Sequence, residues 1–263
     1  MKVLYHYHMF WGDIFNKINS LGSFLFEIIF PKSETSKILS TITHKELLNK
    51  NKISRVNKSN LDNSDHISIF KYGDPFIRKS IKELKYFKNK DAVRLFSKLL
   101  YEELNSIFYI SLNQNSLNQS DSSFTTITAR GDSRGLTFLL IPIPLSKIKF
   151  RERGFNQCEL LCEEIIKLNS FSPSPLPLIY KKDLLIKIKN TKSQTRVSKE
   201  ERVVNIKNAF AINPASPKAS QDNKMTLVIL LDDVYTTGAT MREAVKVLEK
   251  AGVRKIKKVT IAD

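Results

Sequence analysis

The sequence predicts an α/β protein in which helices flank a parallel sheet, with a helical segment at the N-terminus. Two apolar runs support this prediction. Residues 227–231 (Leu-Val-Ile-Leu-Leu) form a short uninterrupted run, which is typical of a strand buried on both faces of a parallel sheet. A second run, at 138–141, is expected to be the first core strand, and a helix is expected after each run. The four core strands are expected near 138–143, 176–180, 227–231 and 257–261.

The length of 263 residues allows one substantial domain plus a smaller appendage. We expect an N-terminal helical or linker region over residues 1–66 and the main domain over 67–263. A run rich in Asn, Gln, Ser and Thr predicts a flexible insertion at 111–135 within that domain.

The formal net charge of +17 favours an anionic partner such as nucleic acid, a membrane surface or a polyphosphate. Another interpretation stays open, because Lys, Asn, Ile and Ser are frequent throughout, as an A+T-biased coding sequence would produce. The charge is also spread along the chain rather than gathered in blocks. We therefore expect any binding of single-stranded or other DNA to be weak, independent of sequence and steeply salt-sensitive.

The N-terminal region shows helical spacing of apolar residues over 10–30, and Pro31 ends this segment. We expect this helix to dock on the main domain or on a second subunit rather than on a membrane. The following stretch, 32–66, is polar and is expected to be weakly structured. No apolar run is long enough to span a bilayer, and 21–30 lacks the cleavage site of a signal peptide. A cytoplasmic protein is therefore expected.

Residues 67–75 resemble a strand and turn, and 76–105 show the spacing of a helix or helix pair. Lys85 lies within this helical segment. It is either a solvated lysine or a ligand for a phosphate. The expected core face of the segment consists of Ile77, Ile81, Leu84, Leu95, Leu99 and Leu100.

Two adjacent carboxylates, Asp232 and Asp233, follow the apolar run at 227–231, and we expect both to be exposed at the strand tip. The loop Thr236-Thr-Gly-Ala-Thr240 comes next and opens a helix expected over 241–251. Free backbone N–H groups and the helix dipole favour a phosphate at such a loop, where Gly238 can adopt positive φ. The carboxylates suit the hydroxyls of a sugar, or a metal that bridges sugar and phosphates. Together these features predict a ribose 5-phosphate site.

Two alternatives explain less of this pattern. A buried strand with a polar turn accounts for the apolar run, but not for the acid pair and the Thr/Gly loop together. A nucleoside triphosphatase strand can also end in paired acids. That class needs a Gly-x-x-x-x-Gly-Lys-Ser/Thr loop upstream, which the chain lacks.

A basic loop, expected over 147–157, precedes a helix that carries Cys158 and Cys162. Lysines and arginines at a helix N-terminus form a second anion site, and two such sites fit a substrate with separated phosphates. Alternatively, Arg151 and Arg153 are solvated and the loop serves to bury its phenylalanines. The two cysteines form an incomplete zinc site and are expected to be small buried core residues.

The stretch 227–240 resembles the motif by which type I phosphoribosyltransferases bind 5-phosphoribosyl 1-pyrophosphate (PRPP): four hydrophobic residues, two acids, two further residues and Thr-x-Gly-x-Thr. The resemblance implies that Asp232 and Asp233 hold the ribose hydroxyls, with Mg²⁺ bridging these hydroxyls and the pyrophosphate. It implies 5′-phosphate binding by Thr236, Thr237, Gly238, Ala239 and Thr240, and pyrophosphate binding by Arg151, Arg153 and Lys85.

Further motifs resemble the ComF family, which is named for a role in DNA uptake during competence. Two departures are Val197, where leucine is usual, and the absence of cysteine pairs after Phe30-Pro31, which makes a zinc ribbon there unexpected. The resemblance extends over about 68–262. Its motifs, in order, are Pro142-Ile-Pro-Leu145, Arg153-Gly-Phe-Asn-Gln157, Thr191-Lys-Ser-Gln194, Ser198-Lys-Glu-Glu-Arg202, Asn205 and Ala209-Phe210.

The resemblance leaves two functions open. The first is an enzyme that transfers phosphoribosyl from PRPP to an unknown acceptor and releases pyrophosphate, mainly by positioning and charge stabilisation. The second is a PRPP-sensing or DNA-uptake accessory protein that uses the same pocket without turnover. A homo-oligomer or a partner from the competence machinery is a further implied possibility.

Overall fold

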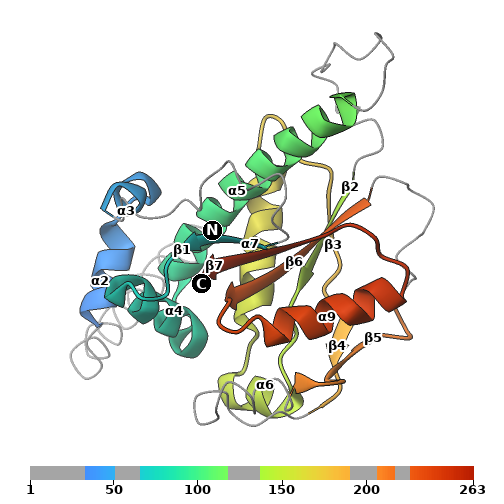
Figure 1. The fold of residues 1–263 in the computed structure, drawn as a ribbon. Coiled ribbons are helices and arrows are strands. Elements are labelled where there is room, and N and C mark those ends of the chain that lie inside the picture. The colour runs from blue at the N-terminus through green and yellow to red at the C-terminus, as the bar shows by residue number, and fades with distance from the viewer. Residues whose placement is uncertain (1–32, 51–65, 118–136, 190–205, 217–225) are drawn as a thin grey trace, which may run out of the picture.

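Five parallel strands form the centre of the molecule, in the order β1-β7-β6-β2-β3 (Figure 1). The computed structural model describes residues 33–50, 66–117, 137–189, 206–216 and 226–263. The expected α/β fold is confirmed, and every strand expected in the core lies in this sheet. The strands are β1 (His66–Phe70), β2 (Thr137–Pro142), β3 (Leu178–Tyr180), β6 (Thr226–Val234) and β7 (Ile256–Ala262).

Helices cover both faces of the sheet. Helices α5 (Lys90–Leu117) and α7 (Gln157–Ser170) lie on one face and α9 (Ala239–Lys250) lies on the other (Figure 1). The side chains of β6 alternate between the two faces. Leu227, Ile229 and Leu231 pack with α5 and α7, whereas Val228 and Leu230 pack with α9. Because both faces are covered, the strand is continuously apolar.

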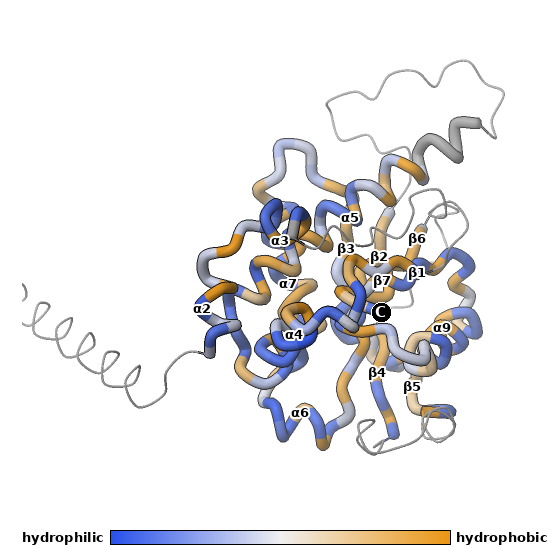
Figure 2. The backbone as a smooth tube through the Cα atoms, turned by 60° about the vertical axis from the view of Figure 1, so that its left-hand side comes forward, coloured by the Kyte–Doolittle hydropathy of each residue, from blue (hydrophilic) through white to orange (hydrophobic). Residues whose placement is uncertain are grey.

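Hydropathy along the backbone follows this layered arrangement. Figure 2 shows apolar strands at the centre of the molecule and hydrophilic segments on α6 (Lys147–Arg153) and α9. Within the described residues, no helix combines the length and the apolar character needed to cross a bilayer.

Helix α4 (Pro75–Phe87) and helix α5 form the expected helix pair. The side chain of Asp74 caps α4 by accepting hydrogen bonds from the backbone N–H groups of Phe76 and Ile77, at 2.8 and 2.9 Å. All six residues of the expected core face are buried. A flexible insertion was expected from residue 111, but α5 continues to Leu117, so this prediction is wrong for residues 111–117. Residues 118–136 lie outside the described part of the chain.

Two helices, α2 (Glu34–Thr41) and α3 (His44–Lys50), occupy part of the stretch that was expected to be weakly structured, so that prediction was wrong there. The hydroxyl of Thr43 and the carboxylate of Glu46 each accept a hydrogen bond from the other residue's backbone N–H, which is a capping box. Leu39 and Leu47 are buried in the same core as the α5 side of the sheet. Local capping and two buried leucines thus order a segment of polar composition. The helix expected at 10–30 lies outside the described residues.

A small antiparallel ribbon, β4 (Leu185–Lys187) and β5 (Phe210–Ile212), lies against α9. The sequence analysis did not identify it, because each strand has only 3 residues and the two are far apart in the chain. The Ala209-Phe210 motif leads into β5, whereas the motifs at 191–194 and 198–205 lie outside the described residues.

Candidate functional site

The carboxyl ends of β2 and β6 meet in the middle of the sheet, and the chain leaves them in opposite directions. After β2 it passes through α7 to β3, and after β6 it passes through α9 to β7 on the other side. Because α7 and α9 cover opposite faces, the ends of the two strands form a topological switch point of the sheet (Figure 1). In open α/β sheets ligands bind at such a switch point. Apart from Lys85, all the expected site residues lie at the end of β6 or in these two connections.

The basic segment after β2 is a helix, α6, rather than the expected loop. The hydroxyl of Ser146 caps its first turn by accepting a hydrogen bond from the N–H of Lys149, and Gly154 ends it with a φ of 75°. The helix spans 7 residues and buries none of them, so its sequence carries no apolar periodicity that would have predicted it. Arg151 and Arg153 lie in its last turn.

Asp233 is buried, with only 4% of its surface exposed, which contradicts the expectation that both acids lie exposed at the strand tip. Its position in β6 directs it to the same face as Leu231, toward α7. Lys85 Nζ lies 3.0 Å from Asp233 Oδ1, and Gln157 Nε2 donates a hydrogen bond of 2.7 Å to Asp233 Oδ2. Burial by itself would lower the pKa of Lys85, but the charge of Asp233 and their hydrogen bond outweigh it and raise this pKa.

Asp232 is half-buried and lies beside the first residues of α7. Its Oδ1 accepts hydrogen bonds from the backbone N–H of Asp233 at 2.8 Å and from the thiol of Cys158 at 3.4 Å. Burial, followed by the charge of Asp233, raises the pKa of Asp232 to about 7. Burial also raises the pKa of the Cys158 thiol, so it remains a protonated donor. The expectation that both cysteines are buried is confirmed.

Arg151 and Arg153 have different surroundings. Arg153 donates a hydrogen bond of 2.9 Å from Nη1 to Gln157 Oε1, and its guanidinium carbon lies 5.1 Å from the centre of the Tyr86 ring. Arg153 therefore orients the amide that holds Asp233. Arg151 is exposed, and within the described residues it makes no ion pair or hydrogen bond.

Two lysines that the sequence analysis did not single out as site residues, Lys149 and Lys187, interact electrostatically with Asp232. Partial burial lowers the pKa of Lys149, with a further contribution from Arg153. Burial also lowers the pKa of Lys187 to about 8, with a further contribution from Lys149. Lys187 comes from β4, outside the two central connections. Nothing in the local sequence distinguishes it from the rest of the 43 lysines and arginines.

The loop Thr236–Thr240 joins β6 to α9, so the expected strand–loop–helix arrangement is confirmed. Gly238 has a φ of 69°, and a Cβ atom there would collide with the phenol of Tyr235 and the guanidinium of Arg242. The loop geometry therefore requires glycine. The loop ends at the N-terminus of α9, where backbone N–H groups and the helix dipole favour an anion. The Tyr235 ring stacks on His66 with 3.8 Å between ring centres, which ties this loop to β1.

Potential metal ligands also gather here. One ligand atom each from Cys158, Asp232 and Asp233 lies within 4.8 Å of the other two. Both oxygens of Asp233 already have partners, and a protonated thiol is a poor ligand for Mg²⁺, which prefers oxygen. Of these three residues, only Asp232 has an available oxygen. This oxygen is Oδ2, which accepts no hydrogen bond from the described residues. The site fits Mg²⁺ provided that a bound ligand supplies further oxygens.

Comparisons with known proteins agree with this geometry. A family model described as a phosphoribosyl transferase domain matches residues 181–263, which contain β6, the Thr/Gly loop and α9. This match and the parallel sheet with its flanking helices are consistent with the expected type I phosphoribosyltransferase-like fold.

Several curated proteins are similar to part of the chain. It is 32% identical over 117 residues to Competence protein F of Haemophilus influenzae, which is 44% of this chain and 46% of that protein. It is 36% identical over 115 residues to Competence protein ComFC of Bacillus subtilis, which is 44% of this chain and 40% of that protein. It is 28% identical over 114 residues to DNA utilization protein YhgH of Escherichia coli O157:H7, which is 43% of this chain and 44% of that protein. The chain thus spans less than half the length of these relatives, and the resemblance to the ComF family is confirmed.

Proposed function

We propose that this chain, which resembles the phosphoribosyltransferase-like proteins of the ComF family, binds PRPP together with Mg²⁺ and transfers its phosphoribosyl group to an acceptor. One observation carries the proposal. The acid pair at the end of β6 and the Gly238 loop that follows it lie together at the topological switch point of the sheet. A carboxylate and a helix N-terminus on one turn suit a sugar diol and its 5′-phosphate.

The surroundings of the two acids support different roles for them. Asp232 keeps one oxygen available, so it would accept hydrogen bonds from the ribose hydroxyls and supply an oxygen to Mg²⁺. Asp233 is enclosed by Lys85 and Gln157, so it would act as a positioning residue. In this proposal the phosphate loop, Thr236–Thr240, holds the 5′-phosphate.

The cations around Asp232 suit a pyrophosphate leaving group. When the bond between C1 and the pyrophosphate oxygen breaks, the electron pair stays on oxygen and positive charge develops on the sugar. Arg151 on α6 is exposed, and Lys149 and Lys187 lie within electrostatic range of Asp232, so these three would stabilise the leaving group. Mg²⁺, when bound, would neutralise further charge on the pyrophosphate. Lys85 and Arg153 already have partners and would act indirectly.

Calorimetric titration of the full chain with PRPP, with and without Mg²⁺, tests the proposal. We expect saturable one-site binding that is at least about tenfold tighter with Mg²⁺. The Asp232→Asn variant is the matched control and should lose the Mg²⁺ dependence, because it removes the oxygen offered to the ion. Absence of PRPP binding by the parent chain in the presence of Mg²⁺ would overturn the proposal.

A second function deserves a test because the relatives are named for competence and DNA utilization and this chain carries a net charge of +17. It is a PRPP-sensing or DNA-uptake accessory protein in which PRPP binds without turnover. Release of pyrophosphate from PRPP distinguishes the two functions, since only the enzyme turns PRPP over. DNA binding, measured at several salt concentrations, should be weak and lose most of its affinity by about 200 mM salt. Nanomolar binding at that salt concentration would contradict a diffuse electrostatic interaction.

A further inference from the structure

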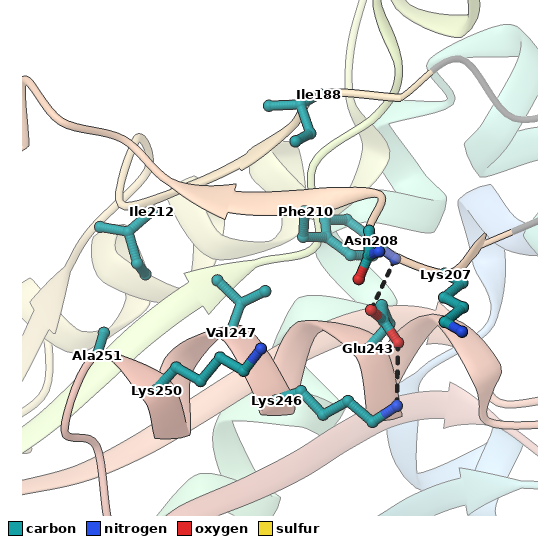
Figure 3. A pocket seen from close by; sticks show the side chains of 10 residues that line it. All are labelled: Ile188, Lys207, Asn208, Phe210, Ile212, Glu243, Lys246, Val247, Lys250 and Ala251. Atoms are coloured by element: carbon teal, nitrogen blue, oxygen red, sulfur yellow. Dashed lines mark hydrogen bonds and ion pairs between the residues drawn. The ribbon is translucent and has the colours of Figure 1, made fainter.

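A pocket outside the candidate site lies between the β4–β5 ribbon and α9 (Figure 3). Its volume is about 510 Å³, which is within the range of small-molecule sites. None of its lining residues belongs to the acid pair, the phosphate loop or α6. The proposed phosphoribosyl transfer therefore leaves this pocket unused.

One side of the pocket is apolar. Ile188, which directly follows β4, and Ile212 of β5 line it on one side, and Val247 lines it from α9 (Figure 3). The side chain of Ile188 is 62% exposed, an unfavourable position for a large aliphatic group in water. This wall offers a contact surface for an apolar body of a ligand.

The rim of the pocket is cationic. It carries Lys207, Lys246 and Lys250 and a single carboxylate, that of Glu243. Glu243 is 7% exposed; its Oε1 accepts a hydrogen bond of 2.8 Å from the N–H of Asn208, and its Oε2 lies 3.3 Å from Lys246 Nζ. Burial alone would raise the pKa of Glu243, but these two contacts lower it, so Glu243 is ionised and balances one lysine.

The other two lysines are not neutralised in this way. Lys207 and Lys250 are exposed, and neither forms an ion pair with a side chain of the described residues. The pocket therefore presents about two uncompensated positive charges beside an apolar wall. Small anions with an apolar body complement both features.

We propose that this pocket binds a small phosphate monoester with an apolar or aromatic body. A phosphate monoester has a second pKa of about 6, so it is a dianion at neutral pH and matches the two uncompensated lysines. Lysine binds phosphate as a point charge without a strict geometry, which suits flexible side chains on a rim. The body of the ligand would cover Ile188, Ile212 and Val247. Inorganic phosphate satisfies only the lysines, and an uncharged aromatic satisfies only the wall.

To test the proposal, the full chain is titrated with phenyl phosphate by calorimetry. Saturating ribose 5-phosphate is present to occupy the phosphate loop, so that the titration does not measure binding at that loop. Inorganic phosphate and phenol should each bind at least about tenfold more weakly than phenyl phosphate. The double variant Lys207→Glu/Lys250→Glu reverses both uncompensated charges and should lose at least about tenfold in affinity for phenyl phosphate.

A matched variant, Lys45→Glu/Lys98→Glu, makes the same change of net charge at exposed lysines on α3 and α5. It should keep the affinity within about twofold, because long-range charge is screened by salt. Equal losses in both double variants would mean general charge attraction, and no binding of phenyl phosphate at about 10 mM would mean no such site. Either result overturns the inference. PRPP binding is measured separately, so failure of this inference leaves the proposed function untouched.

Discussion

Gln157, the first residue of α7, donates a hydrogen bond of 2.7 Å to the carboxylate of Asp233 at the end of β6. The amide oxygen of Gln157 in turn accepts a hydrogen bond from Arg153. A chain of contacts therefore runs from α6 through the start of α7 to the acid pair. Lys85 completes it from α4. The acid pair thus depends on residues from several elements for its position.

The ion pair between Lys85 and Asp233 should be important for stability. Asp233→Asn leaves the Lys85 ammonium, whose side chain is only 21% exposed, without the partner to which it is paired, and we expect a loss of about 3–5 kcal/mol in the free energy of unfolding. The double variant Lys85→Met/Asp233→Asn removes both charges and should recover part of that loss. Urea denaturation measures both effects.

The control for this cycle is Lys182→Met. Lys182 pairs with Glu159 and Glu163, but its side chain is 44% exposed, so its removal should cost less than about 1 kcal/mol. If Asp233→Asn cost no more than this surface variant, the buried pair would have no special importance.

The raised pKa of Asp232 predicts that its ionisation lowers stability as pH rises. An unfolded chain ionises this group near its ordinary value of 3.8, whereas the folded protein does so at about 7. The folded state should therefore lose stability, by about 1–4 kcal/mol, between about pH 4 and pH 7. Asp232→Asn removes this loss, so the variant should gain stability relative to the parent as pH rises from about 5 to 7.5.

The comparison must be made between parent and variant at each pH. Burial lowers the pKa of His66 to about 4, so His66 destabilises the folded state as pH falls through the same range. Its contribution cancels in the difference between the two proteins. A difference that stays constant from about pH 5 to 7.5 would show that Asp232 ionises normally in the folded state.

Arg151 and Arg153 should differ in their effect on ligands. Arg153→Ala releases Gln157 from its hydrogen bond, so it should weaken both PRPP and ribose 5-phosphate, by about three- to tenfold, and lower stability by about 1 kcal/mol. Arg151→Ala removes only an exposed charge. It should weaken PRPP and pyrophosphate by about tenfold and leave ribose 5-phosphate unchanged. Calorimetric titration of the three ligands distinguishes the two patterns, and identical patterns would refute the separate roles.

Gly238 should not tolerate a side chain. Gly238→Ala places a Cβ against Tyr235 and Arg242 at a φ of 69°, and we expect a loss of about 1–3 kcal/mol in stability and at least about tenfold weaker ribose 5-phosphate binding. Gly73→Ala is the matched control, because nothing lies within 4 Å of a Cβ there. Its effect on stability should stay within about 0.5 kcal/mol. Ribose 5-phosphate binding that survives Gly238→Ala would place the 5′-phosphate elsewhere.

The sequence by itself predicted the α/β class, the core strands and the strand–loop–helix unit that contains Asp232 and Gly238. These features are carried by contiguous residues. Burial on both faces makes a strand continuously apolar, and a loop between strand and helix needs residues such as glycine and threonine at fixed positions. These motifs can therefore be identified from the sequence without any knowledge of the neighbouring elements.

Only the tertiary structure decided which side chains surround the acid pair. Lys85 comes from α4 and Lys187 from β4, and no local pattern marks either of them as a partner of Asp233 or Asp232. The burial of Asp233 also follows from the order of the strands and from its contacts with Lys85 of α4 and Gln157 of α7. Electrostatic interactions and desolvation depend on distance in space rather than on separation along the chain. A sequence can therefore identify a carboxylate, whereas its pKa and its partners depend on the packing of distant elements.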